Sequence, residues 1–458
     1  MSHDEAKAMA AHQPSSASFL PFSADTAILP GLIDVHTHIS ELGRDWEGYH
    51  SATRAAAAGG ITTLMGMPLN SIPATTSVES LALEIDAACR TSLMADVGIW
   101  GGAVPENTTS DEGILQLSSL LDAGCFGLKA FLAPLPASAG YETVTPEQLA
   151  KAAALAGQRK KPVLVHSELM TQEEQDRLAD EAYSKGDPRC FSTHVESRPA
   201  KWERDAVDVV CNLTDICHMH VVHLSDAGCL DIIERTKERL SGGNGSANGG
   251  LTVETCPHYM LFDSDSLPDG DTRYKCFPPI RESTNRVELM GRGLLGRRPL
   301  IDIVASDHSP CTPDLRSTDG DIRAAWGGLS GLQYQLQATL TALYSCEHKW
   351  SDDECRLSKI SNWWSAAPSR LAPGMSRIKG RIDTGYQADL CAVDVSYLDP
   401  PSNYASEHHR HKGMTAYAQM PLRGKIRGTW LRGIKVYCGE TDSFWDEQVG
   451  AGSIMLCK

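Results

Sequence analysis

Short apolar runs alternate with longer segments of helical periodicity along most of the chain. From residue 30 onward, each apolar run is followed by a polar or glycine-rich loop and then by a helical stretch, for example 78–90 or 200–213. Strands that alternate with helices in this way predict an α/β fold, a (β/α)8 barrel of the TIM type. The eight predicted strands are residues 33–38, 62–67, 97–103, 127–132, 163–167, 220–224, 251–255 and 301–306.

The pattern divides the chain into three parts. Residues 1–29 are rich in Ala, Ser and Pro without clear alternation, which predicts an N-terminal arm rather than strands. Residues 30–372 predict the barrel domain, whose last helices lie at 329–346 and 358–365. Residues 373–458 predict a small β side domain, with strands at 385–394 and 424–437.

This side domain is expected to be an incomplete β-sandwich, because no strands are predicted before the barrel to pair with it. An incomplete sandwich leaves apolar side chains without a covering sheet. The side chains expected on partly uncovered surface are Leu390, Ala392, Trp430, Leu431 and Val436. Poor solubility or self-association would follow.

Side chains that can hold metal ions recur at the carboxyl ends of the predicted strands. His36 and His38 are two residues apart, so on a strand they point to the same face. In a parallel barrel all carboxyl ends of the strands meet on one rim, where active sites lie. The further side chains at this rim are Lys129, His166, His223 and Asp307.

Each of these residues also has an ordinary structural explanation. A strand-end histidine is commonly a hydrogen-bonded core residue, a lysine extends to solvent, and a Ser-Asp pair caps a helix. All of these explanations would have to hold together at five strand ends, which favours a metal site. His218 and His220 lie at the opposite end of their strand, and His258 is interpreted as a supporting or structural residue.

Composition narrows the class of function. The 458 residues carry a formal net charge of −16, which argues against nucleic acid or an anionic membrane as partner. The 14 cysteines include no Cys-x-x-Cys pair, and the first 20 residues lack an apolar core, so we expect reduced thiols, no secretory signal and a cytoplasmic location. The polar loop 400–412, with His408, His409 and His411, is interpreted as a solvated connection.

Eight motifs together resemble the amidohydrolase superfamily, in the cyclic-amidase branch that includes dihydroorotases and hydantoinases. Within that branch, residues 67–71 and 326–328 favour the allantoinases. The motifs are 30–38 (PGLIDVHTH), 58–63 (AGGITT), 67–71 (MPLNS), 127–129 (GLK), 254–259 (ETCPHY), 278–281 (PPIR), 306–310 (SDHSP) and 326–328 (WGG).

The resemblance implies two divalent metal ions per chain, zinc or a similar first-row ion. His36, His38 and Asp307 would hold one ion, and His166 and His223 the other. Lys129, carboxylated by carbon dioxide to N6-carboxylysine, would bridge them, since a carbamate is an anion whereas a bare ammonium would be repelled. A hydroxide shared by the ions would open a cyclic amide, and Asp307 would transfer the proton to the leaving nitrogen.

The same resemblance implies a small-molecule substrate, allantoin, which would be hydrolysed to allantoate, and a homo-oligomeric protein. Contacts to the substrate are implied at Ser40, Asn70 and Gly328. Dihydroorotases carry an arginine at the position of Ser40 to bind the substrate carboxylate, and allantoin has no carboxylate. Allantoinases usually carry Asn there and Ala at the position of Phe277, so both residues depart from the pattern.

Two alternatives remain open from the sequence. The first is a hydantoinase or dihydropyrimidinase that acts on other cyclic amides. The second is a non-catalytic scaffold descended from this fold, although such relatives lack the metal ligands. A metal count and a hydrolysis assay on several cyclic amides would separate the three.

Overall fold

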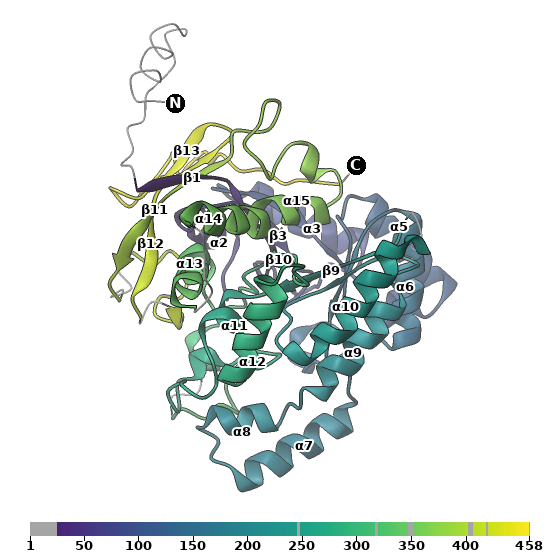
Figure 1. Ribbon diagram of the computed structural model, residues 1–458. Helices are drawn as coiled ribbons and strands as arrows, with labels where there is room; N and C mark the ends of the chain where they lie inside the picture. Colours follow the sequence, from purple (N-terminus) through teal and green to yellow (C-terminus); the bar gives the residue numbers. More distant parts are fainter. Residues whose placement is uncertain are drawn as a thin grey trace, which may run out of the picture.

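A computed structural model describes residues 25–244, 248–316, 319–346, 352–401, 406–417 and 420–457 (Figure 1). All eight predicted barrel strands are present, and one of them is split in two at Trp100. The strands are β2 (Leu32–Thr37), β3 (Ile61–Gly66), β4 (Asp96–Ile99), β5 (Gly101–Gly102), β6 (Leu128–Phe131), β7 (Val163–His166), β8 (His218–Val221), β9 (Gly250–Thr255) and β10 (Ile303–Val304).

These strands form two parallel sheets that together surround one core. Their orders are β2-β3-β4 and β10-β9-β8-β7-β6-β5. The Trp100 amide, between β4 and β5, donates to the Gly66 carbonyl at 3.0 Å. On the other side, the His38 amide donates to the His308 carbonyl at 2.8 Å, and Thr37 forms a parallel bridge with His308. The carboxyl ends of the strands therefore meet on one rim, as the sequence predicts.

Helices cover the outside of the barrel (Figure 1). Several begin at a side chain that caps the first turn; for example, Ser77 and Thr145 accept from backbone amides at 3.2 and 3.3 Å. No helix in the described part of the chain is long and apolar enough to cross a membrane. The longer helices are α2 (Tyr49–Ala58), α3 (Val78–Cys89), α5 (Asp111–Asp122), α6 (Pro146–Gln158), α7 (Gln172–Lys185), α9 (Lys201–Asn212), α10 (Leu230–Arg239), α13 (Gln335–Ser345) and α14 (Asp353–Ser361).

A second, antiparallel sheet lies beside the barrel and contains strands from both ends of the described chain (Figure 1). The prediction that residues 1–29 form only an arm is wrong for its last part, because residues 26–30 form β1, in register with β11. Residues 1–24 lie outside the described part. In sheet order the strands are β1 (Thr26–Pro30), β11 (Leu390–Asp399), β12 (Leu422–Leu431), β13 (Ile434–Cys438) and β14 (Ser443–Phe444).

The prediction that this sheet leaves apolar side chains uncovered is also wrong. Ala392, Leu431 and Val436 are fully buried, Trp430 is 7% exposed, and only Leu390 is half-buried. The barrel helices cover this face instead of a second sheet: the Thr429 hydroxyl of β12 donates to the Ala57 carbonyl of α2 at 2.6 Å. One sheet therefore suffices to bury its apolar side.

Buried charges also join the side sheet to the barrel. The Lys379 ammonium is 2.9 Å from Asp96 of β4 and pairs with Asp389, which lies just before β11. Lys379 is 2% exposed, so this cluster is shielded from water. The C-terminal segment returns to the same strand, where the Val97 amide donates to the Ser453 carbonyl at 2.9 Å.

Candidate active site

A cavity of about 450 Å³ opens at the carboxyl-end rim of the barrel. This size is typical of small-molecule sites. Five of the six predicted metal ligands line it, and Lys129 of β6 is completely buried close by. The five are His36, His38, His166, His223 and Asp307.

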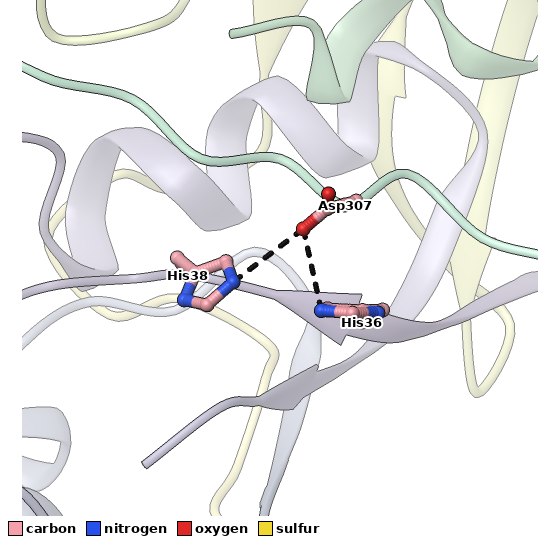
Figure 2. Close-up of side chains that lie close together, drawn as sticks. All are labelled: His36, His38 and Asp307. Carbon is pink, nitrogen blue, oxygen red and sulfur yellow. Dashed lines mark ion pairs between the residues drawn. The ribbon is translucent and has the colours of Figure 1, made fainter. Parts of the chain in front are cut away.

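His36, His38 and Asp307 form the first cluster (Figure 2). Oδ1 of Asp307 lies 3.3 Å from Nε2 of His36 and 3.5 Å from Nε2 of His38. These separations exceed those of ordinary N–H···O hydrogen bonds. The three ligand atoms face one another without forming close hydrogen bonds. They are therefore arranged to hold one metal ion between them.

Hydrogen bonds on the far side of each ring orient these two histidines. Nδ1 of His36 lies 2.5 Å from Oε1 of Glu254, and Nδ1 of His38 lies 2.9 Å from the Leu69 carbonyl oxygen. Each Nδ1 therefore carries the proton, and each Nε2 is left as an acceptor directed at Asp307. Such partners fix the ring and its tautomer for metal binding.

His166 and His223 form the second cluster, with ring centroids 4.6 Å apart. Nε2 of His166 lies 2.9 Å from Oε2 of Glu168, which also pairs with Arg198, so Nδ1 is the nitrogen left for an ion. Nδ1 of His223 has no hydrogen-bond partner among the described residues. Burial lowers the pKa of both histidines and keeps the rings neutral, which is the form that binds metals.

Lys129 lies in β6, with its Nζ 4.4 Å from the centre of the Phe131 ring. The Nζ atom is buried and has no hydrogen-bond partner among the described residues. Burial lowers the pKa of Lys129 to about 7. A neutral amine can add carbon dioxide, whereas an ammonium cannot, so the environment fits a carboxylated lysine.

Glu254 of β9 links the two clusters and was missed by sequence reasoning. Besides its bond to His36, its Oε1 accepts from the His223 amide at 3.1 Å, and its Oε2 lies 2.9 Å from Nε2 of His220. His223 and Asp307 have φ values of 40° and 46°, which are uncommon outside glycine. Such strained positions cluster at functional sites.

Comparison with known proteins agrees with this geometry. The profile of the Amidohydrolase family matches residues 27–436. The chain belongs to the amidohydrolase family. This membership implies a divalent-metal site, and the cluster of His36, His38 and Asp307 fits one.

Among curated relatives, the allantoinase of Arabidopsis thaliana is 39% identical over 425 residues, covering 90% of this chain and 78% of the relative. The allantoinase of Streptomyces avermitilis is 39% identical over 422 residues, covering 90% of this chain and 84% of the relative. The solved L-hydantoinase (dihydropyrimidinase) from Arthrobacter aurescens has a TM-score of 0.78 at 23% identity, covering 93% of this chain and 88% of that chain. This structural likeness shows the fold alone.

Of the three predicted substrate contacts, two line the cavity and one does not. Asn70 and Gly328 line the cavity, beside Phe277 and Lys275. Ser40 is 2% exposed and is not among the lining residues. The Gly328 amide donates to the Lys275 carbonyl at 2.8 Å, which fixes the turn at this edge of the cavity.

His220 and His409, which are not expected to bind metal, make structural contacts instead. Nδ1 of His220 lies 2.8 Å from the hydroxyl of Thr252, and its Nε2 contacts Glu254. The interpretation of His409 as part of a solvated loop is wrong, because it is 3% exposed. It stacks on His308 with ring centroids 5.1 Å apart.

Proposed function

We propose that this protein hydrolyses the ring amide of allantoin to give allantoate. The observation that carries the proposal is the convergence of five ligand-type side chains at one cavity, with Lys129 buried close by, in a chain whose curated relatives are named allantoinases. A non-catalytic scaffold would have no reason to keep all six side chains, nor the carboxylates that orient them.

We propose that His36, His38 and Asp307 hold one divalent ion and that His166 and His223 hold a second. Lys129, as N6-carboxylysine, would contribute to both. Zinc fits this set of imidazole and carboxylate ligands, although other first-row ions do as well. When bound, the ions supply an acidified water as nucleophile and polarise the scissile carbonyl.

We propose Asp307 as the residue that moves a proton. Burial alone would raise its pKa, but His36 and His38 outweigh that effect and hold the pKa below its usual value. The carboxylate is therefore ionised at neutral pH and can accept a proton from the nucleophile. The same group can then deliver that proton to the leaving ring nitrogen.

Much of the rest of the cavity suits an amide-rich ring, and two cationic side chains, Arg198 and Lys275, also line it. Phe131, Phe277 and Trp326 contribute aromatic surface, while Asn70 and the Gly328 turn offer amide groups that can pair with ureide N–H and C=O groups. Residue 40 is Ser, so no arginine at that position binds a substrate carboxylate.

A substrate panel tests this proposal. Protein reconstituted with zinc and bicarbonate should hydrolyse allantoin and should not hydrolyse dihydroorotate, with ring opening followed by NMR. Lys129→Ala is the matched negative variant. Comparable efficiency on the two substrates would contradict the proposal, and a preference for hydantoin or dihydrouracil would favour the hydantoinase alternative.

A further inference from the structure

A second group of ligand-type side chains shares Asp307 with the first. β9 ends at Thr255, and the next residues are Cys256 and the short helix α11 (Pro257–Leu261), which contains His258. One ligand atom each of Cys256, His258 and Asp307 lies within 4.8 Å of the other two. Cys256 and His258 are fully buried, and Asp307 is 7% exposed.

His258 is the unusual member of this group. Both of its ring nitrogens are buried, and neither has a hydrogen-bond partner among the described residues. The ring packs against Tyr259, with centroids 4.2 Å apart, but that contact satisfies no polar atom. Buried polar groups are almost always paired, so an imidazole left with two free nitrogens beside a thiol and a carboxylate requires an explanation.

We propose that Cys256, His258 and Asp307 form a separate site for a thiophilic divalent cation, such as Cd²⁺, Co²⁺ or zinc in excess. Thiolate, imidazole and carboxylate are established ligands of such ions. The remaining candidate metal ligands offer only nitrogen and oxygen atoms, so the sulfur atom of Cys256 gives this site a preference for softer ions. On binding, the metal–sulfur bond replaces the S–H bond of Cys256, and the proton passes to solvent.

Occupancy of this site has a consequence for the first cluster. Asp307 belongs to both groups, so an ion in this site competes with the first cluster for its carboxylate. An ion held by Cys256 and His258 therefore draws Asp307 away from His36 and His38 and inhibits the enzyme. This second part rests on the proposed function.

The site itself is tested by Co²⁺ binding to the zinc-loaded protein. The exposed Cys89 and Cys355 are first replaced by Ser, so that surface thiols do not contribute. Added Co²⁺ should produce a near-ultraviolet thiolate-to-cobalt charge-transfer absorption. Cys256→Ser should abolish it, whereas Cys276→Ser, which removes another buried thiol of the same region, should leave it.

No absorption in the parent protein, or absorption that survives Cys256→Ser in a folded variant, would overturn the site. His258→Gln provides a second variant, with folding of each checked by thermal melting, and its Co²⁺ affinity should fall at least about tenfold, the loss seen even for outer partners of metal ligands.

Inhibition is measured separately, with Cd²⁺ and each variant's own uninhibited rate as reference. The inhibition constant should rise at least about tenfold in Cys256→Ser. Charge-transfer absorption without inhibition would overturn the competition for Asp307. Absence of any allantoin hydrolysis before Cd²⁺ is added would instead overturn the proposed function, while the absorption still decides the site.

Discussion

We propose two roles for Asp307. It is a metal ligand beside His36 and His38, and it is the group that moves the proton. Asp307→Asn separates them, because an amide oxygen can still approach an ion but an amide cannot accept the proton. We expect the variant to retain much of its metal and to lose about 10²–10⁴-fold in turnover. Metal analysis and steady-state rates on the same sample measure both quantities, and near-normal turnover would refute the proton-transfer role.

From the proposed role of Lys129 we expect assembly of the site to depend on pH. Burial lowers its pKa to about 7, so the amine is mostly protonated below that pH and mostly neutral above it. Only the neutral amine adds carbon dioxide. Uptake of zinc by metal-free protein in bicarbonate should therefore increase as the pH rises through about 7, as followed by dialysis and elemental analysis. Uptake that is flat or falls across this range would contradict the role of Lys129.

The six candidate ligands could be identified from sequence because each follows an apolar strand and the barrel brings all strand ends together. Glu254 could not, because its partners are set by pairing in space. Glu254 contacts His36, which is 218 positions away. His409 was misjudged for the same reason, since a polar loop gives no sign that His308 lies above it.

At the scale of elements, strands inside the barrel were predictable and the edge of the side sheet was not. Most barrel strands are buried on both faces and are rich in apolar residues. The burial of β1 (Thr26–Pro30) does not alternate, because its first three residues are half-buried or exposed and its last two are buried, so no strand pattern marks it in the sequence. Sequence also could not show that α2 and α13 cover the sheet, since the contact between them and β12 depends on tertiary packing.

The charge cluster around Lys379 should matter for the attachment of the side sheet. Lys379→Met removes a buried cation from between Asp96 and Asp389 and leaves two carboxylates without it. Breaking a buried pair typically costs about 3–5 kcal/mol, which urea unfolding would detect. Lys185→Met, in an exposed pair with Glu181, is the control and should change the free energy of unfolding by at most about 0.5 kcal/mol. An equal change in the free energy of unfolding in both variants would show that the buried cluster contributes no more to stability than the exposed pair.

In the whole molecule, the barrel carries the candidate site at the carboxyl ends of its strands. The side sheet packs against helices on one side of the barrel. The C-terminal segment reaches back to β4 and the N-terminal β1 pairs with β11, so both ends of the described chain join the fold. The homo-oligomer implied by the family resemblance stays a prediction, and light scattering during gel filtration would measure it.

We propose that six side chains, one of them a carboxylated lysine, assemble a site for two ions. The most direct measurement is the number of zinc ions per chain after reconstitution with bicarbonate and removal of loosely bound metal. From this proposed site we expect two ions in the unaltered protein and a loss of at least one in Lys129→Ala. One ion or none in the unaltered protein, or two retained in Lys129→Ala, would contradict it.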